Sequence, residues 1–306
     1  MDGKVKIGLI GLGSICRKAY MPVLTRERDW TLAGCYSRTP ENRKAFAEEY
    51  RINEFESLEA LSENVDAVII NSSTESHFEL AQFFLEKGIH VLIDKPLAST
   101  VEECEKLVFS SVHNKAKLMV TFNRRFAPLY KMLKDNITST SLIRIVKNRT
   151  DRIGPQSSEF TINDDYIHLV DTARWFFDGK LIVVDGTVAV NSDDHLIYAN
   201  HYYSSPEGCR IETLLHRDAG KTTEIIEVIT EGKTLRVTDL ATVEIEEDNK
   251  KTILSPSQWD TVEKTKGFED AILHFVSSII TNQEPESSGM DALATQRVIE
   301  SIVRSN

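Results

Sequence analysis

Two separate groups of polar residues in this 306-residue chain could carry acid–base chemistry. In the first, Lys95 follows an apolar run, His90 to Ile93, that predicts a strand, and Asp94 and Pro96 flank it. A lysine at the carboxyl end of a strand can exchange a proton with a ligand if burial or a nearby cation lowers its pKa. We therefore treat Lys95 as a candidate acid–base group, against the alternative of a solvated surface lysine.

The second group is Asp164, His168 and Asp171, in a stretch whose helical pattern ends near Asp178. Residues three and four apart lie on one face of a helix, so this face would present two carboxylates and an imidazole to one pocket. The alternative is that Asn163 and Asp164 cap the helix and His168 is an interior histidine with satisfied hydrogen bonds. A metal site is less favoured, because no other histidine is spaced to complete a ligand set.

A glycine-rich turn near the amino terminus indicates a nucleotide site. The apolar run Val5 to Ile10 predicts a strand, and Ser14 to Leu24 has a helical pattern. Gly11 and Gly13 lie between them, where they would let the backbone turn tightly and approach a pyrophosphate at the helix N-terminus. The third position of the usual fingerprint is Cys16. Because such turns also occur for steric reasons alone, the glycines need support from the surrounding elements.

Those elements are apolar β-rich runs that alternate with helical patterns, which predicts a βαβ series and a parallel sheet. Thr39 precedes a first-turn proline, and Ser76–Glu79 and Thr100–Glu103 have capping-box spacing, so helix starts follow strand ends. In an open parallel sheet these loops lie at the carboxyl edge, where ligands bind. The expected strands are Val5–Ile10, Thr31–Tyr36, Ala67–Ile70, His90–Ile93 and Leu118–Thr121.

The end of the second expected strand favours NADP as the cofactor. An NAD-specific fold usually has an acidic residue roughly 20 residues past the glycines for the ribose hydroxyls, but here the sequence is Ser37-Arg38-Thr39. Ser37 can hydrogen-bond a phosphate, and Arg38 can form a charge-assisted pair with it. NAD is the less favoured alternative, in which Arg38 is an ordinary solvated turn residue and the specificity is relaxed.

Three motifs together resemble the Gfo/Idh/MocA oxidoreductase family: Gly11-x-Gly13, Asp94-Lys95-Pro96, and the run FNRRFAP over residues 122–128. The likeness covers essentially the whole chain and is greatest to the virulence-factor MviM-type subgroup. That family usually has Glu-Lys-Pro, so Asp94 is a conservative departure. The resemblance implies a Rossmann domain that binds a nicotinamide cofactor, then an α/β domain with an open, mainly antiparallel sheet. It also implies action on a hydroxyl or keto group of a sugar or cyclitol-like substrate.

The same resemblance suggests roles for individual residues. Asp164 and His168 match the family's Asp-x-x-x-His pair, which binds substrate and assists proton transfer, with Lys95 as the main acid–base group. Asp171 would orient the imidazole or the helix. His77 would face the cofactor, although a first-turn histidine without a role is an equal alternative. The expected cofactor-binding residues are Gly11, Gly13, Ser14, Ile15, Ser37, Arg38, Ser72, Ser73, Thr74, His77, Asp94, Lys95, Pro96, Asn123 and Arg124.

The length of 306 residues, with 41% hydrophobic and 27% charged residues, is enough for two domains that each have a core, which agrees with the enzyme that the resemblance implies. A change of pattern near residue 122 predicts a dinucleotide-binding domain over 1–122 and a substrate-binding and oligomerisation domain over 123–306. Strand-like runs in the second domain alternate apolar with polar residues, as in Thr242–Glu246, which indicates a sheet with one covered face. We expect the other face to be buried in a homodimer or homotetramer.

The net charge of −11 argues against nonspecific binding to nucleic acid or an anionic membrane. The positive charge that an NADP phosphate requires must therefore be local, and the candidates are Arg17, Lys18, Arg38, Arg43 and Lys44. The four cysteines have no metal-ligand spacing, and no apolar run approaches the roughly 18 residues of a membrane span. We expect a cytoplasmic protein with a small polyhydroxylated substrate and neither nucleic acid nor membrane as a partner. A non-catalytic NADP-binding sensor or assembly protein is the alternative function.

Overall fold

The chain folds into two units in a computed structural model that describes residues 3–26 and 28–305. Unit 1 comprises Met1–Phe122 and Phe268–Gln296, and unit 2 comprises Asn123–Gly267 and Arg297–Asn306. The second domain expected from the sequence continued to residue 306, whereas Phe268–Gln296 belongs to unit 1. Backbone hydrogen bonding explains this return, because the amide of Val120 donates to the carbonyl of Ser287 over 2.9 Å.

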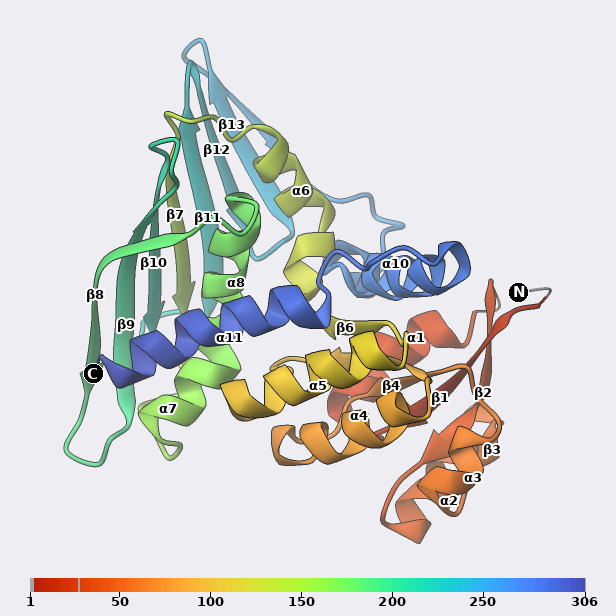
Figure 1. The fold of residues 1–306 in the computed structure, drawn as a ribbon. Helices are drawn as coiled ribbons and strands as arrows, with labels where there is room; N and C mark the ends of the chain where they lie inside the picture. The colour runs from red at the N-terminus through yellow and green to blue at the C-terminus, as the bar shows by residue number, and fades with distance from the viewer. Residues whose placement is uncertain (1–2, 27, 306) are drawn as a thin grey trace. The chain divides into compact units, whose positions relative to one another are not determined.

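Unit 1 is built on a parallel six-stranded sheet in the order β3-β2-β1-β4-β5-β6 (Figure 1). Every residue of β4 and β6 is buried, as expected for parallel strands that have helices on both faces. This strand order is that of doubly wound dinucleotide-binding folds, and it confirms the predicted fold class. The strands are β1 (Val5–Ile10), β2 (Trp30–Tyr36), β3 (Asn53–Glu54), β4 (Ala67–Ile70), β5 (His90–Asp94) and β6 (Leu118–Thr121).

Apart from the helix that begins at Phe268, the helices of unit 1 begin after strand ends, but their caps differ. Thr100 and Glu103 form the predicted capping box, in which Thr100 Oγ1 accepts from the Glu103 amide over 3.2 Å. The box predicted for Ser76 is wrong, because Ser76 ends a 3₁₀ turn and makes no side-chain cap. A π-helical turn, Cys16–Tyr20, precedes α1. The α-helices are α1 (Met21–Leu24), α2 (Pro40–Tyr50), α3 (Leu58–Ser62), α4 (His77–Glu86), α5 (Val101–His113) and α10 (Phe268–Thr281).

Unit 2 contains an eight-stranded sheet in the order β14-β13-β12-β11-β7-β10-β9-β8. Neighbouring strands are antiparallel except for the parallel pair β7 and β10, so the expectation of a mainly antiparallel sheet is confirmed. The strands are β7 (Leu142–Asn148), β8 (Ile182–Val190), β9 (Leu196–Ser204), β10 (Arg210–His216), β11 (Thr223–Thr230), β12 (Lys233–Thr238), β13 (Thr242–Glu247) and β14 (Lys250–Leu254).

Helices cover one face of this sheet, where α6 and α8 pack on its central strands (Figure 1). On β7, the buried residues Ile143, Ile145 and Lys147 alternate with the exposed Leu142 and Arg144. The outward residues form a second surface, which we call the open face. The helices are α6 (Pro128–Asp135), α7 (Ser158–Thr161), α8 (Ile167–Phe176), α9 (Val262–Thr265) and α11 (Gly289–Arg304), whose last residues belong to unit 2.

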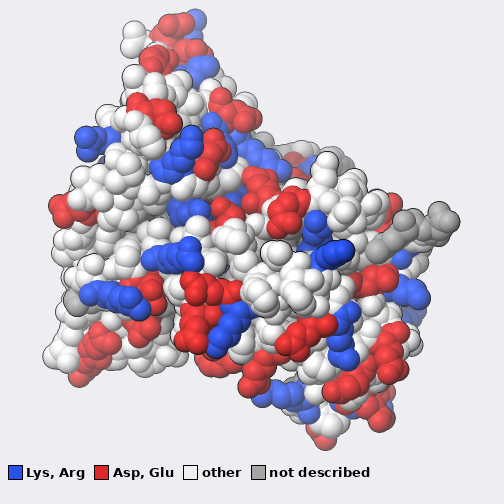
Figure 2. All heavy atoms as spheres, in the orientation of Figure 1, with Lys and Arg blue, Asp and Glu red and all other residues white. Residues whose placement is uncertain are grey.

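Surface charge, the cysteines and the hydrophobicity of the helices can each be compared with what the composition indicates. Acidic and basic side chains are interspersed on the face drawn in Figure 2, so fixed positive charge there is local rather than one broad patch. All four cysteines are buried free thiols. Within residues 3–26 and 28–305, none of the helices combines the length and apolar character needed to cross a bilayer.

Candidate functional site

The turn after β1 is pressed against the loop after β4. Gly11 has φ +84°, and a Cβ there would lie 2.3 Å from the Ser72 nitrogen and 2.4 Å from the Asn71 carbonyl carbon. Only glycine fits, because both the conformation and the space exclude a side chain. At Gly13 a Cβ would meet no atom within 4 Å. The backbone beside this second glycine is therefore open to a ligand at the start of the following helix, where Ser14 and Ile15 are exposed.

A cavity of about 380 Å³ lies in unit 1 at the ends of β1, β2 and β4. Its apolar side chains can hold a flat ring, and its hydroxyl and charged groups can bind a ribose or phosphate. Four residues expected to bind the cofactor, Gly11, Ser37, Arg38 and Ser72, meet here. The full lining is Ile10, Gly11, Tyr36, Ser37, Arg38, Thr39, Leu58, Ser72, Ser76, Glu79, Leu80 and Phe83.

Of the five basic residues considered for a phosphate site, Arg38 is the one that lines this cavity. Arg43 is buried, and its Nη1 donates to the Ser37 carbonyl over 3.2 Å while its Nε donates to Glu54. It therefore holds the turn in place instead of facing a ligand. Arg17 pairs with Glu49. The cation that faces the cavity at the end of β2 is therefore Arg38.

Glu79 is a lining residue that the sequence interpretation assigned to another role. It was expected to complete a capping box with Ser76, but that box is not formed. Its carboxylate lies in the first turn of α4 and lines the same cavity as Arg38. The cavity thus contains one acidic and one basic side chain, and the acidic one comes from α4 rather than from the end of β2.

His77 connects the two loops that follow β4 and β5. The imidazole Nδ1 lies 2.8 Å from the Pro96 carbonyl oxygen, and Nε2 lies 3.1 Å from that of Ser72. The ring is 1% exposed, and burial lowers its pKa, which favours the neutral form. A neutral imidazole donates through one nitrogen only. Both neighbouring atoms are carbonyl oxygens, which only accept, so the neutral ring donates to one of them at a time. Through these contacts His77 positions the segment that carries Lys95.

The remaining predicted residues of unit 1 lie around these loops. Asp94 ends β5, and the Tyr20 hydroxyl lies 3.5 Å from its Oδ1. Lys95 follows and is half-buried, as is Asp94, while Pro96 is buried. Ser73 precedes a 3₁₀ turn that begins at Thr74. The loops after β1, β2, β4 and β5 therefore bring the expected cofactor residues of unit 1 to one sheet edge.

In unit 2, the helical face expected for Asp164, His168 and Asp171 is not regular. The chain makes a π-helical turn over Ile162–Tyr166 before α8, which alters the spacing of residues across it. Asp164 is exposed and His168 half-buried, whereas Asp171 is interior. Asp171 accepts two hydrogen bonds from Arg125, from Nε over 2.8 Å and from Nη2 over 2.5 Å. The structure therefore places Asp171 in a buried ion pair.

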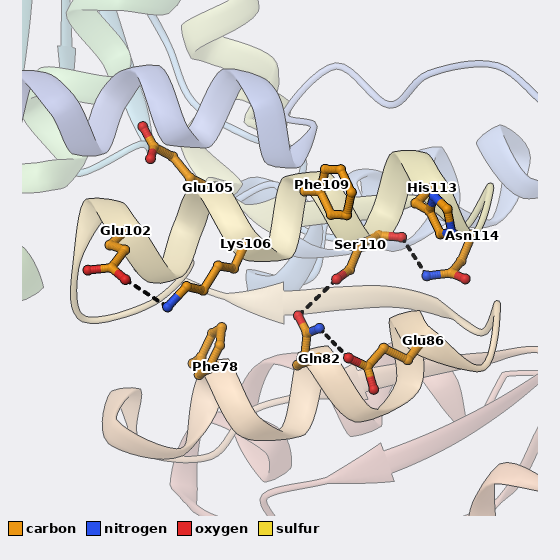
Figure 3. Close-up of a pocket in the computed structure, with 10 residues that line it drawn as sticks. All are labelled: Phe78, Gln82, Glu86, Glu102, Glu105, Lys106, Phe109, Ser110, His113 and Asn114. Atoms are coloured by element: carbon orange, nitrogen blue, oxygen red, sulfur yellow. Dashed lines mark hydrogen bonds and ion pairs between the residues drawn. The ribbon is translucent and has the colours of Figure 1, made fainter.

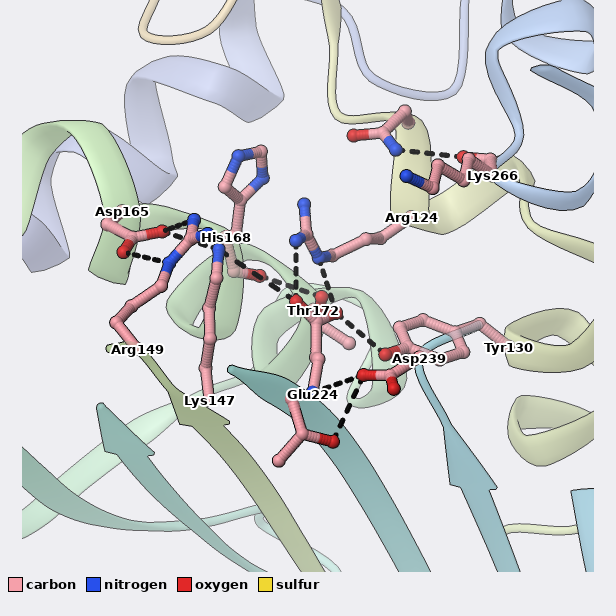
Figure 4. Close-up of polar contacts among 12 residues, drawn as sticks. Arg124, Tyr130, Lys147, Arg149, Asp165, His168, Thr172, Glu224, Asp239 and Lys266 are labelled. Atoms are coloured by element: carbon pink, nitrogen blue, oxygen red, sulfur yellow. Dashed lines mark hydrogen bonds and ion pairs between the residues drawn. The ribbon is translucent and has the colours of Figure 1, made fainter. Parts of the chain in front are cut away.

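A buried charge network lies beneath His168 in unit 2 (Figure 4). Arg124 donates to both carboxylate oxygens of Glu224, from Nε over 2.7 Å and from Nη2 over 2.6 Å. Tyr130 donates its hydroxyl to Glu224 over 2.7 Å. The Asn123 amide donates to the Lys266 carbonyl over 2.8 Å. Asn123 and Arg124, both expected to bind the cofactor, thus make these contacts within unit 2.

The second carboxylate of this network, Asp165, was missed from the sequence. It accepts from Arg149 over 2.8 and 2.9 Å and from Arg217 over 2.9 Å, and it lies 2.5 Å from Lys147 Nζ. The spacing rule selected its neighbour Asp164 instead. The available signal was Lys147, because this lysine follows Ile143 and Ile145 on the buried face of β7. A charged residue at such a position needs a buried partner.

The charged groups of the network shift one another's pKa values. Burial opposes the charged form of Glu224, but Arg124, the charge of Lys147 and the Tyr130 hydroxyl together outweigh it and lower the pKa of Glu224 to about 2. Burial, followed by the positive charge of Arg124, lowers the pKa of Lys147 to about 8. For Asp165, hydrogen bonding to Arg149 and the charge of Lys147 outweigh burial and lower its pKa. The network is therefore held by opposite charges at neutral pH, with Lys147 the most easily discharged cation.

A separate groove of about 590 Å³ lies between α4 and α5 (Figure 3). Its polar groups pair across or along the helices, as in the hydrogen bond from Ser110 to Gln82 and the ion pair of Lys106 with Glu102. Phe109 on this surface is 70% exposed. None of the residues predicted to form the site lines this groove. Its greater volume therefore does not make it the better candidate.

The doubly wound sheet, the tight Gly11 turn and the cavity at the strand ends define a dinucleotide-binding protein. The chain belongs to the Gfo/Idh/MocA family of oxidoreductases. Residues 5–122 match the oxidoreductase family with an NAD-binding Rossmann fold, and residues 128–248 match the C-terminal domain described as YceM-like. The recognised family is thereby confirmed.

Individual relatives match almost the whole chain. YceM of Salmonella typhimurium, which is named an oxidoreductase, is 38% identical over 98% of this chain and 97% of its own. The MviM dehydrogenase structure from Clostridium difficile is 37% identical, with a TM-score of 0.95 and 99% of each chain covered. An inositol 2-dehydrogenase of Rhizobium meliloti is 26% identical over 98% of this chain and 96% of its own. The protein is therefore an oxidoreductase of this family.

Proposed function

We propose that this protein transfers hydride between NADP and a hydroxyl or keto group of a small polyhydroxylated substrate. The observation that carries the cofactor assignment is Arg38, which lines the cavity at the end of β2 where an NAD-specific fold would have an acidic residue. Bound NADP would supply the hydride acceptor or donor. The residues present fit this cofactor, because the backbone is open at Gly13 and the cavity at the strand ends has both apolar and phosphate-binding side chains.

The substrate class is inferred from the chemistry of the chain and from its relatives. An inositol 2-dehydrogenase acts on a cyclic polyol by its name. In this chain, Lys95 would take the hydroxyl proton as the alcohol carbon is oxidised, and would return it in the reverse direction. Asp164 would hold a substrate hydroxyl, and His168 would position or relay the proton. These three roles and the remaining predicted cofactor contacts of unit 1 form part of the proposal.

A panel of sugars, inositols and their keto forms tests this proposal. Each compound is mixed with the protein and either NADP or NAD, and the absorbance of the reduced nicotinamide is followed. We expect turnover with at least one compound and a preference for NADP. Cofactor binding without turnover of any compound would favour a non-catalytic sensor or assembly protein on the same fold.

A further inference from the structure

Two nitrogens of the Arg124 guanidinium are held by the protein, while the third, Nη1, makes no hydrogen bond within residues 3–26 and 28–305. The Nε and Nη2 atoms donate to Glu224, and the side chain is only 12% exposed. These two bonds use two of the five N–H groups of an arginine. Figure 4 shows the third nitrogen, Nη1, pointing away from Glu224 and from the sheet. Glu224 is in turn held by the Tyr130 hydroxyl, so the open N–H groups of Arg124 have a fixed direction.

A second cation lies beside the turn that carries Arg124. The Lys266 carbonyl accepts from the Asn123 side chain, directly before Arg124 in the chain. The following residue, Gly267, has φ +81°, and a Cβ there would lie 2.2 Å from the Asn123 carbonyl oxygen. The backbone at Lys266 is therefore tightly packed on this turn. Its ammonium extends toward the side of Arg124 in Figure 4, and no acidic group in the described part of the chain forms an ion pair with it.

Lys147 and Arg124 are close enough for their positive charges to repel each other. Lys147 lies 3.8 Å from the same Glu224 carboxylate that holds Arg124. After burial, the charge of Arg124 is the main cause that lowers the pKa of Lys147. An additional negative group at Arg124 would reduce this repulsion. The charge of Lys147, which is 3.8 Å from Glu224, would therefore add to the attraction of Arg124 for an anion.

We propose that Arg124 Nη1 and Lys266 Nζ together bind an oxyanion group of the substrate, either a carboxylate or a phosphate. The fixed guanidinium would provide directed N–H donors, and the lysine would provide a mobile point charge. This inference rests on the proposed function for its statement that the anion belongs to a substrate. The site would narrow the proposed substrate class from polyhydroxylated compounds in general to acidic sugars, such as sugar acids and sugar phosphates.

Calorimetric titration of the NADP-loaded protein tests this site without requiring turnover. The probes are D-glucose, D-glucuronate, D-glucose 6-phosphate and inorganic phosphate, so the sugar ring and the anion are varied separately. Lys266→Gln should weaken binding of the preferred acidic sugar about tenfold or more, the range of a charged hydrogen bond. Lys264→Gln is the matched control, since this exposed lysine two residues away pairs with Asp260 and should leave binding unchanged.

Arg124→Lys keeps a positive charge near Glu224 but removes the planar fork, and a thermal melt shows whether the variant is folded. A folded Arg124→Lys protein should also bind the acidic sugar about tenfold more weakly. Preference for glucuronate identifies a carboxylate and preference for glucose 6-phosphate a phosphate, and either supports the site. Equal binding of glucose and the acidic sugars, no binding of any anion, or no effect of Lys266→Gln would overturn it. Anion binding that depends on Lys266 without NADP reduction by any compound would instead refute only the proposed function.

Discussion

Arg125 and Asp171 form a buried bidentate ion pair in unit 2, with side chains that are 3% and 1% exposed. The pair joins the turn over Asn123–Phe126 to α8, the helix that carries His168. Because both charges are removed from water, each compensates the charge of the other, and the loss of either would leave an uncompensated charge in the interior. The pair therefore contributes to the position of α8 as well as to the stability of the unit.

Asp171→Ala should lower the free energy of unfolding by about 3–5 kcal/mol, because it leaves the guanidinium of Arg125 buried without this carboxylate. Urea denaturation followed by circular dichroism measures the loss. Glu102→Ala, which breaks the exposed Glu102–Lys106 pair on α5, is the control and should cause little change. Similar losses of unfolding free energy in the two variants would show that the buried pair stabilises the protein no more than an exposed pair does.

Arg38→Ala should weaken NADP binding roughly 10- to 100-fold and leave NAD binding nearly unchanged, since a charged hydrogen bond contributes about 1.5–3 kcal/mol. Ser37→Asp should reverse the preference, because a carboxylate would repel the 2′-phosphate and accept from a ribose hydroxyl. Fluorescence titration with each cofactor checks both variants. Lys44→Ala is the control, as this exposed lysine does not line the cavity. Equal loss for NADP and NAD in Arg38→Ala would contradict the assignment.

Alanine variants of the three proposed catalytic residues should show different kinetic defects. Lys95→Ala should abolish turnover but keep NADP binding within a few-fold of the wild type. His168→Ala should lower the rate of hydride transfer by roughly 10²- to 10⁴-fold, and Asp164→Ala should raise KM as well as lower kcat. Single-turnover measurements with an accepted substrate separate these effects. Near wild-type rates in Lys95→Ala would restrict the lysine to a structural or cofactor contact.

Glu224 should make stability depend on acid pH. Its pKa is lowered to about 2 from an ordinary value of 4.5, so the unfolded chain binds more protons between these values. The stabilisation is present above pH 4.5 and is lost as the pH falls toward 2. Urea midpoints of the wild type and Glu224→Gln across this range should therefore converge toward the acid end. Parallel curves would show that Glu224 does not titrate in this way.

The open face of unit 2 is expected to form a homodimer or homotetramer contact. Leu142 and Ile229 are cross-strand neighbours on this face and are exposed, as is Tyr202. Ile229→Lys should weaken assembly, because it places a charge among apolar side chains that association would bury. Light scattering at micromolar concentration measures the mass, with Lys44→Ala as a surface control. A wild-type mass of 34.6 kDa would identify a monomer and refute the prediction.

Local patterns were sufficient for five of the six strands of unit 1, all except β3, and for the edge at which they place a ligand. The strand at Val5–Ile10, the turn at Gly11 and the capping box at Thr100 each depend on residues within a few positions of one another. Hydrophobic periodicity and backbone sterics act over this range. The parallel direction of the strands followed because the predicted connections between them contain helices.

Only the tertiary structure decided which polar groups meet across longer separations. Arg124 and Glu224 are 100 residues apart, and Arg125 and Asp171 are 46 apart. The residue types indicated that such charges need partners, but many acidic residues could serve, so spacing could not select one. Likewise, Phe268–Gln296 returns to unit 1 because Ser287 completes hydrogen bonds beside β6. The sequence by itself therefore determined the elements and their ligand-binding edge, whereas the packing of distant segments decided the charge network and the placement of Asp171.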